Sequence, residues 1–287
     1  MVVGRRLVNL VAEHKKTAIT TIFGLIAGPI IGYLITDYIT ITLSDLANYL
    51  ENGDVSKFNE DRKQIKQQFV LDGLDLSDKN LNGANLNSLI ILHANLSGMH
   101  LQNAKLENTQ ISGDLSEIDL RNATLLNTDL SGADLSAAKL SHANLSAADL
   151  TDAFLSNANL SGADIPYAEL TRANLVYANL SGAYLASADL TRADLASADL
   201  TRALLSAADL TDANLNGTTL TNARLSFADL TNAFVLNADL TNAALNLANL
   251  NESVFDCNSL RTANLAVVNV SQIHIVDSNL NEVSSCD

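Results

Sequence analysis

The residue types that carry most enzymatic and metal chemistry are sparse in this chain of 287 residues. No pair of histidines has metal-ligand spacing with a carboxylate or a thiolate nearby. We therefore predict no metal site, and we expect each histidine to lie on the surface. The five histidines are His14, His93, His100, His142 and His274.

Serine and threonine, which could supply nucleophiles, are abundant, but their placement follows a repeat. One of them comes directly after a Leu in nearly every unit, and neither a Gly-x-Ser-x-Gly motif nor a phosphate-binding loop occurs. A pocket would need an irregular insertion, which the repeat lacks. We therefore predict a non-enzymatic protein with no catalytic residue and no cofactor.

The element that positions all these side chains is a repeat of five residues. Every fifth residue from Leu115 to Leu280 is apolar, and the residue two places earlier is Ala at every step from Ala133 to Ala213. This period matches neither the helical period of about 3.6 nor the strand period of about 2, so the chain must turn at a fixed interval. Leu and Ala are expected to point inward and the other three residues outward.

The units resemble those of the pentapeptide-repeat family, as in Ala-Asp-Leu-Ser-Ala (133–137) and Ala-Asp-Leu-Thr-Arg (188–192). The resemblance covers residues 71–280. It implies an all-β solenoid, a right-handed quadrilateral β-helix with one pentapeptide per side and about twenty residues per coil. Because one thin coil cannot bury its Leu residues alone, the coils must stack, at about 4.8 Å each.

The register of the repeat slips once. Apolar centres recur every five residues from Leu71 to Ile111, but the next centre, Leu115, comes only four residues later. The small-residue position in this shortened unit is Gly113. We expect a bulge or a local bend between Ile111 and Leu130.

The two ends of the rod are expected to differ. Residues 37–70 are predicted to be a linker with two short capping helices, with Ser44 and Ser56 as their N-caps. The second helix would cover the first coil with Phe58, Ile65 and Phe69. At the other end, before the tail at 281–287, no cover is apparent. We expect a homodimer through the C-terminal coil, contact with a partner, or a frayed end. The apolar residues of these last units are Val267, Val268, Val270, Ile273, Ile275 and Val276.

The two cysteines, Cys257 and Cys286, are expected to be free thiols. Cys286 would fall on the opposite side of the coil from Cys257, and a disulfide would require the tail to fold back.

Residues 17–36 carry no charge and are long enough to cross about 30 Å of hydrocarbon as a helix. A cleaved signal peptide and a helix buried in a soluble assembly are the alternatives, but no Ala-x-Ala site follows the apolar stretch. Residues 1–16 are basic, so the positive-inside rule places them in the cytoplasm and the rod on the far side. Gly24, Gly28 and Gly32 would let two such transmembrane helices pack as a dimer.

The charge of the chain is strongly negative. The formal net charge is −15, and residues 71–287 carry nine Lys or Arg against 25 Asp or Glu. This balance excludes direct binding of nucleic acid through phosphates. The resemblance offers another interpretation, since some family members present an acidic rod that imitates DNA to a type II topoisomerase. The structural interpretation is that Asp and Asn suit tight turns because they bond nearby backbone.

Outward residues can be sorted by side, because positions twenty apart should stack. The side centred on Leu170 and Leu190 is acidic, whereas the side centred on Ile165 and Leu185 collects apolar exceptions. Contiguous exposed apolar area usually marks an interaction surface, although chance clustering is the alternative. The candidate partner-binding residues are Pro166, Tyr167, Tyr184, Leu204, Phe227 and Leu247, and we expect Tyr177 and Phe234 to add to them from an adjoining side.

These observations predict a membrane-anchored, non-enzymatic module for protein–protein interaction or scaffolding. Its rod would lie on the periplasmic or thylakoid-luminal side, and its protein partner is unknown. The alternative is an acidic DNA mimic that binds a type II topoisomerase, which requires the rod to lie in the cytoplasm.

Overall fold

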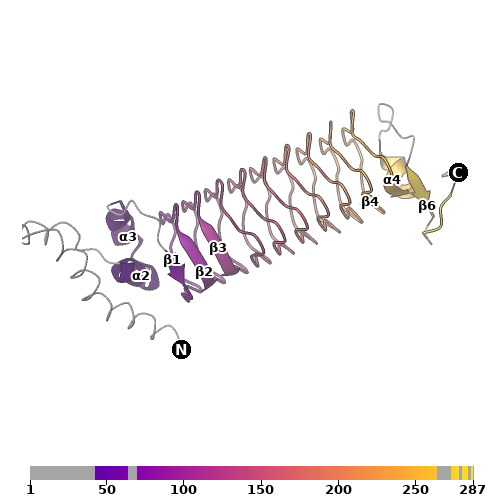
Figure 1. Ribbon diagram of the computed structural model, residues 1–287. Helices are drawn as coiled ribbons and strands as arrows, with labels where there is room; N and C mark the ends of the chain where they lie inside the picture. The colour runs from indigo at the N-terminus through magenta and orange to yellow at the C-terminus, as the bar shows by residue number, and fades with distance from the viewer. Residues whose placement is uncertain (1–42, 64–69, 264–272, 278–279, 284–285, 287) are drawn as a thin grey trace, which may run out of the picture.

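A computed structural model describes residues 43–63, 70–263, 273–277, 280–283 and 286 of the chain. Figure 1 shows a long rod of stacked coils, with described helices at both of its ends. Helices α2 (Leu43–Asn52) and α3 (Val55–Arg62) lie at the N-terminal end, and α4 (Cys257–Thr262) lies at the C-terminal end.

Each regular coil consists of four pentapeptide units, one on each side. Parallel bridges join residues twenty apart, as in Glu169 to Asp189 and Asp189 to Asp209. The amide of Leu150 donates to the carbonyl of Glu169 at 2.7 Å, so backbone hydrogen bonds connect neighbouring coils. The predicted solenoid of pentapeptide repeats is therefore confirmed.

The core of the rod is a stack of Leu and Ala. Both positions of the unit are almost completely buried along the regular coils, as for Ala188 and Leu190. A few buried positions carry a hydroxyl instead, and these hydroxyls donate to backbone carbonyls, as from Thr218 to Leu215 at 2.7 Å. Each coil shares this core with its neighbours, so the buried apolar area accumulates with the number of coils.

The turns explain the preference for Asp or Asn before each Leu. The side chain of Asp189 accepts the backbone N–H of Thr191 at 2.8 Å, and Asn179 accepts that of Ser181 at 3.0 Å. The second residue of each turn has positive φ, which is the type II arrangement. The acidic composition of the rod is thus largely a consequence of its turn chemistry.

The expected irregularity lies between strands β2 (Ile90–Asn95) and β3 (Gln110–Asp114), which form a parallel sheet with β1 (Val70–Asp72). The register shifts between Ile91 and Ala94, opposite the shortened unit. Bridged residues are then 19 apart until the separation returns to twenty after β3. The lost residue is confirmed as the cause, and the irregularity lies within the predicted range, since Ile91 pairs with Ile111 and Ala94 pairs with Gly113.

At the N-terminal end, α2 and α3 cover the first coil as expected. The side chains of Leu46, Leu50 and Phe58 are fully buried against the Leu stack. The Asn59 side chain accepts the N–H of Asn85 at 2.7 Å and donates to the carbonyl of Gly83 at 2.9 Å, which satisfies the open edge of the coil.

Of the two expected N-caps, the structure describes only that of α3, and it differs from the prediction. Asp54, rather than Ser56, caps α3, because its carboxylate accepts the N–H of Lys57 at 3.0 Å. The side chain of Ser44, together with Ile65 and Phe69, lies outside the described residues.

At the C-terminal end, α4 interrupts the repeat that was expected to continue to residue 280. The N-cap of α4 is Asp256. The hydroxyl side chains of α4 accept backbone N–H groups that would otherwise donate to carbonyls of a following coil. Ser259 accepts the N–H of Ala238 at 2.8 Å, and Thr262 accepts that of Leu240 at 2.9 Å. The prediction that this end lacks a cover is therefore wrong on the side where α4 lies.

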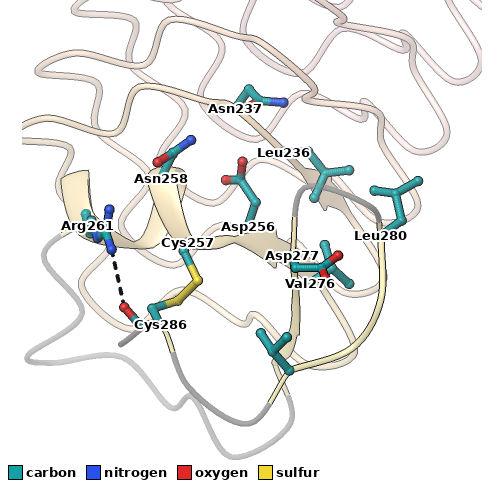
Figure 2. Close-up of a pocket in the computed structure, with 11 residues that line it drawn as sticks. Leu236, Asn237, Asp256, Cys257, Asn258, Arg261, Val276, Asp277, Leu280 and Cys286 are labelled. Carbon is teal, nitrogen blue, oxygen red and sulfur yellow. Dashed lines mark hydrogen bonds between the residues drawn. A yellow bond between two sulfur atoms is a disulfide. The ribbon is translucent and has the colours of Figure 1, made fainter.

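The tail folds back on the last strands and is tied down covalently. Strands β4 (Phe234–Val235), β5 (Val254–Asp256) and β6 (His274–Val276) form a parallel sheet. The amide of Val283 then donates to Ile275 at 2.8 Å, so the chain has reversed. Cys257 and Cys286 form a disulfide with their Cα atoms 5.3 Å apart, which shows that the prediction of free thiols was wrong (Figure 2).

The predicted transmembrane segment, 17–36, and its glycines at 24, 28 and 32 lie outside the described residues. In the part of the chain that is described, no helix combines the length and the apolar character needed to cross a membrane.

Candidate interaction surface

The apolar wall is the surface formed by exposed Tyr167, Tyr184, Phe227 and Leu247 together with half-buried Pro166 and Leu204. Tyr184 and Leu204 are joined by a parallel bridge, so they lie one above the other in consecutive coils. The amide of Phe227 donates to the carbonyl of Asn246 at 3.0 Å, which places Phe227 beside Leu247. The structure therefore brings these six residues onto one side of the rod, as predicted.

Three side chains of the apolar wall stand at turn positions that bulky residues rarely occupy. Tyr167, Phe227 and Leu247 have φ of 58°, 63° and 58°, and their exposed fractions are 69%, 62% and 68%. A large residue in this left-handed region costs about 1 kcal/mol or more relative to Gly or Asn. These side chains therefore contribute little to the core and carry a conformational cost.

Tyr177 and Phe234 do not adjoin the apolar wall. They belong to units centred ten residues from those of the wall, and ten residues correspond to two sides of a four-sided coil. Both side chains are exposed, but they lie on the opposite side of the rod. The prediction that they extend the wall is wrong, and the rod has two separate apolar surfaces.

One edge of the apolar wall borders a column of carboxylates. We call this column, formed by Glu169, Asp189, Asp209 and Asp229, the acidic ladder. Its members are bridged in sequence from coil to coil, which stacks them about 4.8 Å apart. Each follows a corner residue of the wall side by two positions, so Tyr167 precedes Glu169 and Phe227 precedes Asp229.

Within the acidic ladder, Asp189 keeps its charge at neutral pH. Partial burial of Asp189 opposes ionisation, but hydrogen bonds from Thr191 and Thr171 hold the pKa of this carboxyl below its usual value. The nearest arginines on the next corner are paired elsewhere, because Arg172 binds Asp152 at 2.6 Å. The side beyond the apolar wall is therefore negative.

His93 and His100 lie beside carboxylates at the surface of the rod. His93 lies 3.1 Å from Asp72 and His100 lies 3.8 Å from Asp119. Asp119 is buried, and its hydrogen bonds with Arg121 hold its pKa well below the usual range. Among the residues that the structure describes, no group of three or more His, Cys, Asp or Glu could hold a metal ion. His14 lies outside those residues.

A hollow of about 450 Å³ lies beside the disulfide at the C-terminal end (Figure 2). Its polar side chains serve the local fold. Asp256 accepts the N–H and the hydroxyl of Ser259, and Arg261 donates to the carbonyl of Cys286 at 3.3 Å. These hydrogen bonds hold α4 and the tail in place, and the hollow could not be predicted from the sequence because it depends on the folded-back tail.

Known proteins share this repeat and this architecture. The model of the pentapeptide repeats family matches the chain in eight copies, within residues 80–113, 114–152, 138–175, 168–206 and 198–235. HetL from the cyanobacterium Nostoc sp. strain PCC 7120, a pentapeptide repeat protein involved in heterocyst differentiation regulation, is 28% identical with a TM-score of 0.56. The match covers 74% of this chain and 94% of HetL.

Two further solved structures are similar over part of the chain. A trypsin-treated form of QnrB1, a plasmid-mediated fluoroquinolone resistance protein, is 15% identical with a TM-score of 0.46, covering 74% of this chain and 93% of QnrB1. The pentapeptide repeat protein alr5209 from Nostoc PCC 7120 is 30% identical with a TM-score of 0.28, covering 37% and 84%. Among proteins of curated function, none matches this chain. The matched repeats span residues 80–235, more than half of the sequence, and the chain belongs to the pentapeptide repeat family.

Proposed function

We propose that this protein is a non-enzymatic binding module, anchored in a membrane by residues 17–36, whose rod captures a protein partner on its apolar wall. The observation that carries the proposal is the exposure of Tyr167, Phe227 and Leu247 at left-handed turn positions. These side chains lower the stability of the rod and do not cover its core. Residues that strain the backbone are typical of functional sites. Contiguous apolar area on a soluble surface supports the same conclusion.

Partner capture by variants of the wall tests this proposal. Replacing Tyr184, Leu204 and Phe227 together with Ser removes apolar side chains that make no core contact, so the rod should fold normally. We expect the variant to lose capture of the partner that the unmodified chain retains in a pull-down. The matched control, with Phe154 and Phe234 replaced by Ser on the opposite side, should keep it. Equal capture by both variants would contradict the proposal.

The disulfide between Cys257 and Cys286 supports a position of the rod outside the cytoplasm. Structural disulfides form and persist in the periplasm and comparable compartments and are rare in the cytosol. A reporter fused after Asp287 tests this placement. We expect a reporter that requires an oxidising compartment to be active; activity only of a cytoplasmic reporter would contradict the placement.

A second candidate is a DNA mimic that binds a type II topoisomerase, and the acidic ladder favours it. Four carboxylates stacked along the rod present a regular negative column. This function needs a cytoplasmic rod and does not use the apolar wall. Inhibition of supercoiling by the protein, retained in the Tyr184, Leu204 and Phe227 variant, would support it over the first proposal.

A further inference from the structure

We infer that the partner segment bound by the apolar wall is a basic amphipathic α-helix lying along the rod, with its apolar stripe on the wall and Lys or Arg residues over the acidic ladder. This inference rests on the proposed function and adds the chemistry of the partner to it.

The spacing of the coils suits a helix in this orientation. Coils recur about every 4.8 Å along the rod, and an α-helix advances about 5.4 Å per turn. Apolar residues three or four apart on the partner would therefore meet successive coils. The stretch from Tyr167 to Leu247 spans four coil steps, since stacked residues are twenty apart. A helix of roughly 13 residues would cover this length.

Charge on the two edges of the apolar wall differs, which specifies the partner further. The acidic ladder borders the edge formed by Tyr167 and Phe227. The other edge carries Gly162 and Gly182 at its turns, followed along the same column by Arg202, Asn222 and Asn242, so these turn positions hold one cation and no carboxylate. A helix with its basic residues along the flank that faces the acidic ladder complements this difference. The wall itself has Asp164 beside Tyr184 and Arg224 beside Leu204 in one column, which favours a basic group at one end of the stripe and an acidic or polar group further along.

Two other occupants fit this side less well. An added β-strand needs free backbone groups, but the N–H of Tyr184 already donates to Ala163 and that of Leu185 to Leu204. A second copy of the rod packed antiparallel on this side would bring a like-charged ladder against this one, which costs free energy. The backbone and the charge pattern therefore both favour the helix.

A binding assay with designed peptides and the full-length chain tests the inference. The probe is a fluorescent amphipathic peptide of about 18 residues with a Leu stripe and Lys on one flank, and its control carries Glu in place of Lys. In the ladder variant, Asp189, Asp209 and Asp229 become Asn, which keeps the turn acceptor that Asn179 provides elsewhere. We expect this variant to bind the Lys peptide at least tenfold more weakly than the unmodified chain. The variant with Tyr184, Leu204 and Phe227 replaced by Ser should not bind it.

The outcomes separate the inference from the function on which it rests. Equal binding of the Lys and Glu peptides, or no effect of the ladder variant, overturns the basic helix. So does a dimer of the chain in light scattering that the Ser variant abolishes. In each case the proposed function stands if the Ser variant still loses partner capture in the pull-down. If capture is unchanged in that variant, the proposed function itself fails.

Discussion

Tyr184 lies directly against Leu204 in the next coil, joined by a parallel β-bridge, and both side chains stand outside the Leu stack. In the regular coils this bridge position usually carries Asp or Asn, whose side chain closes the following turn. Tyr184 and Leu204 cannot accept that hydrogen bond. The turn hydrogen bond therefore does not account for Tyr184 and Leu204 at this position.

The turn residues of the apolar wall should be stabilised by substitutions that remove their side chains. Replacing Tyr167 and Phe227 with Asn, which occupies the same left-handed position at Asn222, should raise the free energy of unfolding by roughly 0.5–1 kcal/mol each. Denaturant unfolding measures this gain. Tyr184→Asn, at a bridge position without positive φ, is the control for side-chain loss alone. A loss of stability in both turn variants would contradict the account of strain.

Gly113 should tolerate no side chain. Its φ is 129°, and a Cβ atom there would overlap the backbone carbonyl of Ala94 in the neighbouring coil. We expect Gly113→Ala to lower the free energy of unfolding by roughly 2–4 kcal/mol, since backbone atoms must move. Gly132→Ala, where a Cβ meets nothing within 4 Å, should cost only about 1 kcal/mol. Equal costs in denaturant unfolding would show that the shortened unit is not tightly packed.

Loss of the disulfide should loosen the end of the rod and leave its middle unchanged. The two cysteines are 29 residues apart, so the loop-entropy estimate for Cys286→Ser is a loss of about 3–4 kcal/mol. Because coils contact only their neighbours, the loss should be confined to the last strands. Hydrogen exchange should accelerate at β6 and stay unchanged near Leu190. Faster exchange along the whole rod would contradict this local role.

The folded-back tail should also weaken as pH rises. Hydrogen bonds from His274 to Glu252 at 2.8 Å and Glu282 at 2.7 Å raise the pKa of His274 above 6.5. Since the folded-state pKa is the higher one, this stabilisation is fully present below pH 6.5 and is lost as pH rises through the folded pKa. Exchange of the Val283 amide, corrected for the intrinsic rate, should therefore be faster at pH 8.5 than at pH 6. His274→Gln should remove the difference, and an unchanged pH dependence in that variant would exclude His274 as its source.

The regular coils could be predicted because nearly every inward position repeats the same two residue types. Ala188, Leu190 and the equivalent residues of the other coils are the apolar side chains that form the buried core. The cover at Phe58 was also predictable, because an open coil end must be shielded. Ten residues correspond to two sides of the coil, so the repeat alone predicts that Tyr177 lies opposite the apolar wall. The expectation that Tyr177 lies on an adjoining side was a counting error.

The C-terminal cap was harder to predict because Leu260 keeps the five-residue spacing inside a helix. The available signal was Asp256, a residue type that favours the N-cap of a helix and here accepts the N–H of Ser259. The disulfide, and the contact of His274 with Glu282, both depend on the tail reversing after β6. Such a reversal is a long-range event that the local repeat does not encode.

The central claim is that the apolar wall contacts a partner protein, and site-specific photo-crosslinking in cells that produce the protein tests it most directly. A photoreactive phenylalanine at Leu204 is compared with one at Thr219, a bridge position of similar burial on another side of the coil. The account predicts a discrete crosslinked partner from position 204 and none from position 219. Equal crosslinking from both positions, or none from position 204, would contradict it.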